Sequence, residues 1–317
     1  MKALITGING FAGSFLAESL VGSNAVVAGT IQPGTTLENI ATIKDTLSLF
    51  EVDLLDQEKL AIVFNSFSPD VIFHLAGASS VKESFDHPAK FLNVNVMGSL
   101  NLLENVKKYV PQATVLLVTS GAIYGESLSA DNLVDEQSRV LPKSPYAVSK
   151  AAQDMLGRVY VQAANLKIVI ARPFNHIGPR QSDDFFVSTV ARQVAEIIKG
   201  KKSPELNLAN IEVYRDFTDV RDMVAAYLLL SQKGRAGEAY NICSGKRYFL
   251  KDIVNMFIEL SGKNIAIKLD PARLRKLDLV DMQIDNSKII RATGWKPEVE
   301  IQQSLKDTLG YWLSKVA

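Results

Sequence analysis

Short, almost wholly apolar runs alternate with longer amphipathic segments through the first half of the chain. Runs of this kind are typical of parallel strands that are buried on both faces. The segments between them space their apolar residues as helices packed on a sheet do. The pattern predicts strands at 2–6, 26–30, 49–52, 71–75, 114–119 and 167–171, and helices at 15–20, 57–67, 91–109 and 146–163.

This alternation predicts an α/β protein with a Rossmann-type, doubly wound parallel sheet over residues 1–172. The pattern then breaks, and Pro, Gly and Asp cluster at 173–184. We expect 173–317 to form mainly a smaller α/β substrate-binding domain, a cap over the carboxyl edge of the sheet. Parts of 211–243 are expected to complete the first domain. The cap is expected to contain helices at 185–199, 220–232, 250–261 and 301–315 and a strand at 238–242.

Composition narrows the class of protein. The 317-residue chain is 47% hydrophobic and 22% charged, as is ordinary for a soluble globular protein. Its formal net charge of +1 argues against nucleic acid as a partner, because phosphate binding requires a surplus of Lys and Arg. The single cysteine, Cys243, excludes an internal disulfide, and no His, Cys, Asp or Glu cluster has metal-ligand spacing. No apolar run approaches the ~18–20 residues that a membrane-spanning helix needs, so we expect a cytoplasmic protein without metal or membrane partner.

Three glycines, Gly7, Gly10 and Gly13, lie between the first expected strand and the first helix. Glycine allows a tight turn and lets a pyrophosphate approach the helix N-terminus, where free N–H groups and the helix dipole favour anions. The spacing is G-x-x-G-x-x-G rather than the G-x-G-x-x-G of simple dehydrogenases. We predict a dinucleotide-binding loop that includes Phe11 and Ala12. The alternative is a strand–helix turn that binds no ligand.

The residues after the second strand choose between NAD and NADP in such folds. An acid there binds the ribose 2′-hydroxyl of NAD, whereas a nearby arginine suits the 2′-phosphate of NADP. Residues 28–32 contain neither, and Thr30 could donate a hydrogen bond to a phosphate. The pattern therefore favours NADP(H) and leaves NAD(H) open. Asp53, at the end of the third strand, is placed either to bind the adenine amine or to cap a helix.

Tyr146 and Lys150 stand four residues apart and therefore share one face of an expected helix. A nearby ammonium stabilises the phenolate, which lowers the pKa of a tyrosine from about 10 and lets it transfer a proton near neutral pH. Ser120 follows the strand at 114–119 and can hold a carbonyl or alcohol oxygen opposite the tyrosine. Because Tyr-x-x-x-Lys is common, simple packing would explain the pair if no dinucleotide loop preceded it.

Matching motifs run along almost the whole chain, at 6–13, 53–54, 74–77, 95, 120, 124–125, 146–150, 172–175, 215–217, 286–288 and 294–295. With these motifs the chain resembles the extended short-chain dehydrogenases/reductases that act on nucleotide sugars. The resemblance implies catalysis by Ser120, Tyr146 and Lys150, and usually a homodimer. It implies that Tyr146 and Lys150 also contact the cofactor, together with Leu54, Leu75, Ala76 and Gly77.

The family contains dehydratases, epimerases and reductases. Its dehydratases resemble one another in carrying an acid pair or a Ser-Glu between the triad hydroxyl and the Tyr-Gly pair. Gly121 and Ala122 occupy these positions here and cannot do acid–base work, which argues against a dehydratase. Epimerases tolerate small residues there but usually hold NAD with an acid after the second strand, which this chain lacks. A 4-ketoreductase needs only the triad and an exchangeable cofactor.

Within the family, stretches 173–181, 215–222 and 270–275 resemble the reductases of GDP-4-keto-6-deoxy-mannose. This implies NAD(P)H-dependent reduction of the 4-keto group of GDP-4-keto-6-deoxy-D-mannose to GDP-D-rhamnose, with a proton from Tyr146. The alternatives are a UDP-sugar 4-epimerase with bound NAD and a nucleotide-binding regulator without chemistry. Guanidinium groups match phosphate oxygens, although each arginine could instead form a surface ion pair. The expected substrate-binding residues are Ser79, Asn175, Arg180, Arg215 and Arg273.

Overall fold

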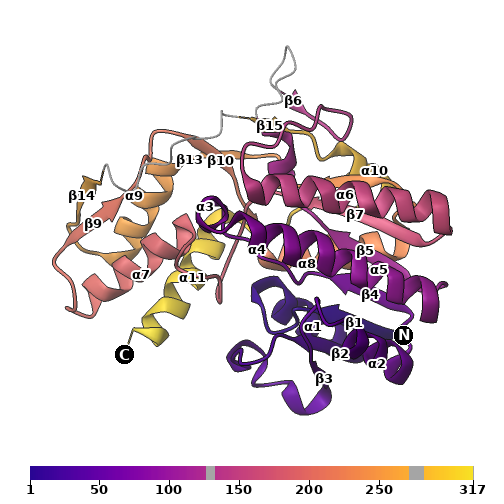
Figure 1. Ribbon diagram of the computed structural model, residues 1–317. Coiled ribbons are helices and arrows are strands. Elements are labelled where there is room, and N and C mark those ends of the chain that lie inside the picture. Colours follow the sequence, from indigo (N-terminus) through magenta and orange to yellow (C-terminus); the bar gives the residue numbers. More distant parts are fainter. Residues whose placement is uncertain (126–132, 271–281, 317) are drawn as a thin grey trace.

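The computed structural model describes residues 1–125, 133–270 and 282–316. Two lobes stand side by side in Figure 1: a larger one around a central sheet, and a smaller one built from the later part of the chain. The larger lobe confirms the predicted Rossmann-type α/β fold.

Seven parallel strands form the central sheet in the order β12-β7-β5-β4-β1-β2-β3. The order reverses at β1 and β4, and in this fold ligands bind at the carboxyl ends of the strands at such a reversal. Thr6, the last residue of β1, lies between Thr30 of β2 and His74 of β4. The strands are β1 (Lys2–Thr6), β2 (Val26–Ile31), β3 (Ser48–Glu51), β4 (Val71–His74), β5 (Thr114–Val118), β7 (Lys167–Pro173) and β12 (Ala239–Ile242).

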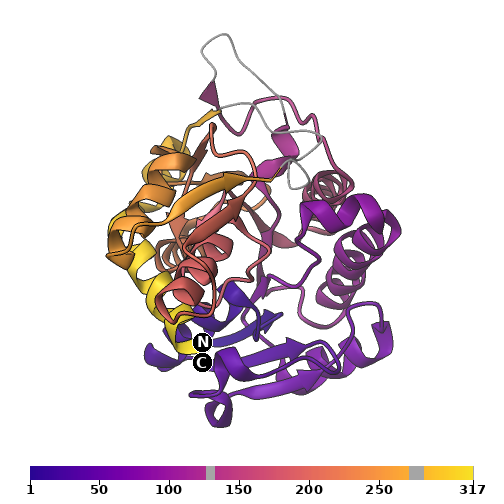
Figure 2. The ribbon, with the colours of Figure 1, turned by 90° about the vertical axis from the view of Figure 1, so that its left-hand side faces the viewer.

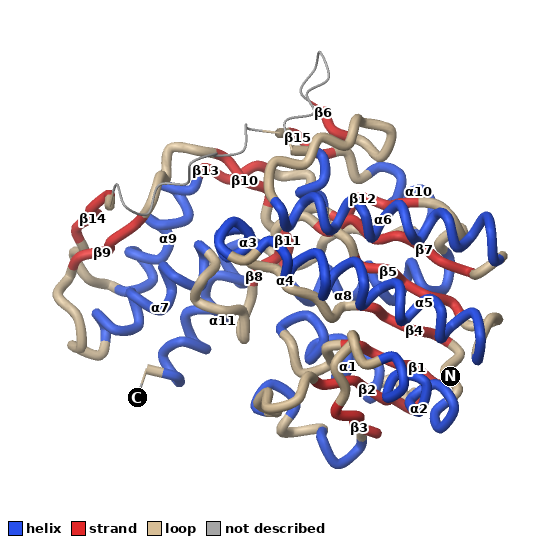
Figure 3. Tube along the Cα trace, in the orientation of Figure 1, coloured by secondary structure: helices blue, strands red, loops and turns tan. Residues whose placement is uncertain are grey.

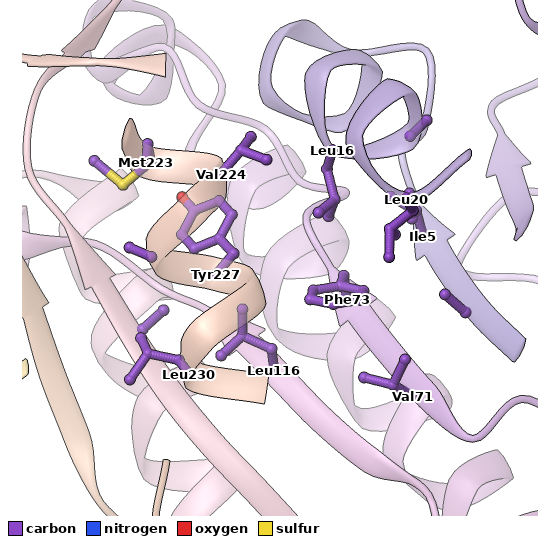
Figure 4. Packing of buried hydrophobic residues seen from close by; sticks show 14 of the residues in the cluster. Ile5, Leu16, Leu20, Val71, Phe73, Leu116, Met223, Val224, Tyr227 and Leu230 are labelled. Carbon is purple, nitrogen blue, oxygen red and sulfur yellow. The ribbon is translucent and has the colours of Figure 1, made fainter. Parts of the chain in front are cut away.

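Helices cover both faces of the sheet (Figure 3), which explains why the strands are apolar along their whole length. On one face, Leu16 and Tyr227 belong with Phe73 and Leu116 of the strands to one hydrophobic core, shown in Figure 4. A second core joins further helices to the other face. The first face is covered by α1 (Phe11–Gly22), α8 (Val220–Lys233) and α10 (Ser287–Thr293), and the second by α2 (Gln57–Phe67), α5 (Gly98–Tyr109) and α6 (Pro145–Ala164).

The single helix expected over 91–109 is divided into three parts. α4 (Pro88–Leu92) leads into η3, a π-helical turn at Asn93–Met97, and α5 follows. Asn95 in this turn is fully buried, and its side-chain amide bonds the backbone N–H and carbonyl of Ala78 at 2.8 and 3.0 Å. The expected regular helix is therefore wrong at η3, where a buried side chain is anchored to a neighbouring loop.

The smaller lobe has a hydrophobic core of its own. Figure 2 views the molecule from this side, with the orange and yellow helices toward the viewer. Three helices pack around this core, and short paired strands lie beside them. These elements are α7 (Phe186–Ile198), α9 (Leu250–Ser261), α11 (Ile301–Lys315), β9 (Glu205–Leu208) with β14 (Ala266–Leu269), and β10 (Tyr214–Asp216) with β13 (Arg247–Phe249).

The chain passes between the two lobes more than once. β12 and α8 return to the sheet, so the second half of the chain supplies part of the larger lobe. α10 and Trp295 also pack there, beyond the parts of 211–243 that the sequence pattern assigns to it. The remaining elements are β6 (Leu133–Val134) with β15 (Gln283–Ile284), β8 (His176–Ile177) with β11 (Thr218–Asp219), α3 (Val81–Asp86), and the 3-10 turns η1 (Glu38–Ile40), η2 (Lys44–Thr46) and η4 (Gly121–Tyr124).

Candidate active site

The glycine loop lies where the strand order of the sheet reverses. Gly7 has a φ of +70°, and a Cβ there would stand 3.0 Å from Cα of Ala76, in the loop after β4. The N–H of Gly7 donates to the carbonyl of Thr30 at 3.0 Å, which ties the loop to β2. A Cβ on Gly13 would clash with the carbonyl of Gly7. α1 can therefore start this close to the loop only with glycine at that position.

The N-terminus of α1 is open to a ligand. Gly10 is its N-cap and supplies no side-chain cap, and the first turn holds no acidic residue. The N–H groups of this turn are therefore available to an anion such as a pyrophosphate. Phe11 and Ala12 lie half-buried at the helix start. The ring of Phe11 stacks on His176 with centroids 5.4 Å apart, so the segment after β7 covers this helix end.

The open end of β2 is lined by residues that sequence reasoning missed. Thr30 itself is only 2% exposed, so its hydroxyl is not presented to a ligand as we expected, and its carbonyl holds the glycine loop. Asn9 Nδ2 donates to Thr35 Oγ1 and to the carbonyl of Thr36, both at 2.9 Å. The sequence signal for these residues was the polar stretch at 34–36, Gly-Thr-Thr, shortly after β2. Asp53 is exposed after β3, where one carboxylate oxygen accepts a backbone N–H at 2.9 Å.

The loop after β4 carries three of the predicted cofactor contacts. Leu75 and Ala76 are half-buried and Gly77 is exposed. A Cβ on Gly77 would stand 2.7 Å from Oδ1 of Asn95, so the backbone must approach η3 closely. Leu54, predicted in the same group, is buried after β3.

Ser120 and Tyr146 meet at the carboxyl end of β5. Ser120 is the N-cap of η4, where its Oγ accepts the N–H of Ala122 at 3.1 Å. Tyr146 lies in the first turn of α6, close enough to Ser120 for the serine hydroxyl to favour the ionised tyrosine. The edge of its ring contacts Phe91, with centroids 6.3 Å apart. The structure thus brings the two predicted catalytic hydroxyls together.

The start of α6 determines where Lys150 points. Ser144 caps the helix and Pro145 occupies its first position, which suits proline. Lys150 is therefore one turn after the tyrosine on the buried face, and it is 6% exposed. Its Nζ donates to the carbonyl of Val118 at 3.0 Å and to Oε1 of Gln153 at 2.9 Å. Sequence reasoning missed Gln153, although its place three residues after Lys150 was a signal.

Burial dominates the electrostatics of Tyr146 and Lys150. It lowers the pKa of Lys150 from 10.5 to about 7, so that ammonium and amine coexist near neutral pH. It raises the pKa of Tyr146, and the hydroxyl of Ser120 acts in the opposite direction. The lower tyrosine pKa expected from the sequence is not seen, because the loss of hydration outweighs the other effects.

Two predicted substrate-binding residues lie where the lobes meet. Asn175 is exposed after β7, and its Nδ2 donates to the carbonyl of Asp216 at 3.1 Å. Arg215 lies half-buried in β10, where Nη1 donates to the carbonyl of Tyr214 at 2.6 Å. The Asp216 carboxylate accepts the N–H and hydroxyl of Ser244 at 2.8 and 3.0 Å. Asn175 and Arg215 are thus attached to one strand pair of the smaller lobe.

The other predicted substrate residues are placed differently. Arg180 forms an ion pair with Glu18 at 2.7 Å and donates to Oγ of Ser14 at 3.2 Å. Its guanidinium is thereby held on α1, and this placement speaks against the substrate contact that we predicted. Ser79 is exposed in the loop after β4. Arg273 lies outside the described residues.

A parallel sheet with reversed strand order, a glycine loop at the reversal and a Ser-Tyr-Lys group at the sheet edge define a dehydrogenase/reductase of the short-chain class. The family model described as GDP-mannose 4,6 dehydratase matches residues 4–308. The chain belongs to this family, within the extended short-chain dehydrogenases/reductases. The predicted family is confirmed.

Relatives with different activities match over their whole lengths. The chain is 34% identical to the GDP-6-deoxy-D-mannose reductase of Pseudomonas aeruginosa, over 99% of this chain and 98% of the relative. A structure of RMD from Pseudomonas aeruginosa complexed with NADPH is 33% identical, with a TM-score of 0.86 and 99% of both chains covered. The UDP-glucose 4-epimerase of Thermus thermophilus with NAD is 31% identical, with a TM-score of 0.87 and coverages of 98% and 99%. The fold alone therefore does not separate a reductase from an epimerase.

The described residues contain neither a membrane-spanning helix nor a metal cluster. Across 1–125, 133–270 and 282–316, no helix is long and apolar enough to cross a membrane. In the same ranges, no group of three or more His, Cys, Asp or Glu side chains could hold a metal ion.

Proposed function

We propose that this protein is an NAD(P)H-dependent 4-ketoreductase that converts GDP-4-keto-6-deoxy-D-mannose to GDP-D-rhamnose. The observation that carries the proposal is a Ser120–Tyr146–Lys150 group, with Ser120 and Lys150 buried and Tyr146 half-buried, beside an open dinucleotide loop and with no acid at 121 and 122. The similarity to a GDP-6-deoxy-D-mannose reductase and to an NADPH-bound structure supports this choice of substrate and cofactor.

The glycine loop fits a dinucleotide, since it leaves the first turn of α1 uncapped and its close contacts admit no side chain. That turn would hold the pyrophosphate, Asp53 the adenine amine and Lys150 a ribose hydroxyl. NADP(H) is favoured because Asn9 and Thr35 offer polar groups beside β2. Glu51 accepts the N–H of the nearby Gly34 and keeps NAD(H) as the second cofactor to test. When bound, the reduced nicotinamide supplies the hydride.

The chain's own residues handle the ketone oxygen. Ser120 donates a hydrogen bond to the C4 oxygen, and Tyr146 transfers its proton to that oxygen as the ketone becomes an alcohol. The ammonium of Lys150 stabilises the tyrosinate that is left. A positioned general acid contributes about 10²–10⁴ in rate. The diphosphate would be bound by Asn175 and Arg215 and, as the family resemblance implies, by Arg273.

The packing around η4 excludes dehydratase chemistry at this site, although the family takes its name from a dehydratase. A Cβ on Gly121 would stand 2.5 Å from the ring of Phe174. That ring stacks on the fully buried Tyr124 with centroids 6.1 Å apart, so it cannot easily move aside. Ala122 offers only a methyl group. An acid pair therefore has no place between Ser120 and Tyr124.

A UDP-sugar 4-epimerase is the second candidate, because an epimerase with NAD shares the fold at 31% identity. An epimerase returns the hydride to the sugar and consumes no cofactor. It would be isolated with bound NAD, whereas the ketoreductase exchanges its cofactor at every turnover.

The test is absorbance at the reduced-nicotinamide band with purified protein, NADPH and GDP-4-keto-6-deoxy-D-mannose. Oxidation that stops when the sugar is consumed supports the reductase, and UDP- and dTDP-keto sugars test the choice of base. Tyr146→Phe should lose most turnover and keep cofactor binding, whereas the control Tyr109→Phe should keep both. If the keto sugar causes no oxidation of NADPH or NADH, the reductase is rejected and the epimerase is favoured. A regulator would keep its function in Tyr146→Phe.

The surface of α6 supports a homodimer, which we propose together with a cytoplasmic location. Val148, Met155 and Val159 are 45%, 56% and 53% exposed and form one stripe along the helix. Leu92 and Met97, also exposed, extend this apolar surface onto α4 and η3, which contact α6. A second copy of the chain would bury it by two-fold symmetry. Sedimentation of Met155→Glu should show a monomer where wild type shows a dimer, and cell fractionation tests the location.

A further inference from the structure

We propose that Gln153 is a positioning residue that directs the Lys150 ammonium and supports its charge. Gln153 is fully buried on the inner face of α6. The part of the proposal that concerns turnover rests on the proposed function. The part that concerns the protonation of Lys150 rests only on the contacts described below.

Two neutral acceptors hold Lys150 from one side. Nζ donates to Oε1 of Gln153 at 2.9 Å and to the carbonyl of Val118 at 3.0 Å. An ammonium has three N–H donors, so one proton remains for Tyr146 or a ribose hydroxyl. A lysine side chain loses rotamer freedom when it is held in one direction, and these two acceptors determine that direction.

The direction of the Gln153 amide follows from Ser99 in α5. Ser99 Oγ lies 2.6 Å from the carbonyl oxygen of Asn95, so its single proton is donated there. Ser99 can then only accept at its two other contacts, from Nε2 of Gln153 at 2.8 Å and from Nε2 of His74 at 2.9 Å. Gln153 therefore turns its NH₂ to Ser99 and its oxygen to Lys150.

His74 connects this arrangement to β1. Because its Nε2–H donates to Ser99, Nδ1 of the neutral ring accepts from the hydroxyl of Thr6 at 2.8 Å. Thr6 Oγ1 in turn accepts the N–H of Ala76 at 3.1 Å. Burial and then the charge of Lys150 lower the pKa of His74 to about 3, so the ring stays neutral. The protons of Ser99, His74 and Thr6 are thereby assigned, and none of these three side chains changes protonation near neutral pH.

The groups that face Lys150 come from several elements. Tyr146 precedes it on α6 and stays protonated near neutral pH, since burial raises its pKa. His74 on β4 is neutral. Asp154, the next residue after Gln153, is turned to Arg172 of β7 and accepts from it at 2.8 Å. Burial is the resolved cause of the low pKa of Lys150. The oxygen of Gln153 accepts from the Lys150 ammonium and favours its charged form. A substitution at Gln153 can remove this acceptor or replace it with a carboxylate.

The first test follows Lys150 itself in the cofactor-free protein. Lysines are labelled at Cε with ¹³C, and the Lys150 resonance is identified by its loss in Lys150→Met. Gln153→Glu should raise the titration midpoint by about one pH unit or more, because a carboxylate then faces the ammonium. Gln153→Met should lower the midpoint by a similar amount. The control Gln162→Met, at an exposed position of the same helix, should leave it unchanged.

The second test is the pH dependence of kcat/KM for the keto sugar. Turnover needs the ammonium form of Lys150, so the rate falls as pH rises through its pKa. Gln153→Glu should move this basic limb to higher pH, and Gln153→Met to lower pH. Gln153→Met should also lower kcat about tenfold while KM stays within about twofold. A merely structural residue would not move the limb in opposite directions in the two variants.

The outcomes separate this proposal from the proposed function. An unchanged Lys150 midpoint in both folded variants overturns the positioning role. Midpoints that shift as expected, in a protein that reduces no keto sugar, support the positioning role and reject the function. If Gln153→Met does not fold, Ser99→Ala tests the proposal instead. This variant removes the acceptor that orients the Gln153 amide and should lower the titration midpoint of Lys150. An unchanged midpoint rejects the proposal.

Discussion

Two buried cations, Lys150 in α6 and Arg172 in β7, have opposite electrostatic surroundings. Arg172 donates to both carboxylate oxygens of Asp154, at 2.8 and 3.0 Å, and lies over the ring of Tyr124. Burial disfavours its charge, but Asp154 more than compensates, and the pKa of the guanidinium rises above its ordinary value. Lys150 is held by two neutral acceptors, and burial lowers its pKa to about 7.

The difference shows how one helix serves both stability and chemistry. Lys150 and Asp154 are separated by a single helical turn, yet the buried cation that pairs with the carboxylate is Arg172. A buried charge with a counter-charge is fixed in one protonation state. A buried cation with only neutral acceptors can change its protonation in the range where enzymes work. Among the described residues, the contacts of Lys150 include no counter-charge, and we propose that this makes the candidate site reactive.

The largest effect is expected from Lys150→Met. We expect kcat to fall about 10³-fold, because the tyrosinate loses its cation. The free energy of unfolding should stay the same or rise, since a buried ammonium without a carboxylate is removed. Steady-state absorbance and urea unfolding measure the two effects. Turnover within tenfold of wild type would contradict the role of Lys150.

Asp154→Asn should have the opposite effects, a large loss of stability and a small change in kcat. It leaves Arg172 buried without a counter-charge, and we expect the free energy of unfolding to fall by about 3–5 kcal/mol. The kcat of the folded protein should change by less than about threefold, because the Asp154 carboxylate contacts Arg172 and Arg158 rather than the candidate catalytic residues. Urea unfolding and active-site-normalised turnover check both. A loss of stability below about 1 kcal/mol would show that the pair is not needed.

The pH dependence of stability should distinguish the two cations. The pKa of Lys150 is depressed in the folded state, to about 7 from 10.5, so between these values the unfolded chain binds the extra proton. Stability should therefore rise with pH across this window, by up to about 1.4 kcal/mol per pH unit, relative to Lys150→Met. Unfolding curves of both proteins from pH 7 to 10 measure the difference. If the free energy of unfolding has the same pH dependence in both proteins, the Lys150 ammonium is hydrated in the folded state.

The smallest effect is expected at Arg158, the second partner of Asp154. Its Nε lies 3.1 Å from the carboxylate, but its side chain is 39% exposed. Exposed pairs contribute little, so Arg158→Ala should cost less than about 1 kcal/mol in the free energy of unfolding. A loss as large as that of Asp154→Asn would mean that Arg158, rather than Arg172, is the partner that matters.

Local signals were enough for most elements and for the candidate triad. The helix at 57–67 is observed as predicted, because Asp56 caps its start and Ser68 ends it in the left-handed conformation. Ser120, Tyr146 and Lys150 follow from position, since a strand end and a helical spacing of four place them at one sheet edge. Such features depend on neighbours in the chain, so the sequence alone reveals them.

The sequence by itself thus determined the class of protein, the order of strands and helices and the residues that can do the chemistry. Only the tertiary structure decided that Thr30 is buried, that Arg180 is bound to Glu18 and that the oxygen of Gln153 faces Lys150. Each of these depends on partners from distant segments, as Gln153 depends on Ser99 and Ser99 on η3. Periodicity and motif spacing report which residues share a face. They do not report which buried donor finds which acceptor, and in a dry interior we propose that this pairing supports the charge of Lys150.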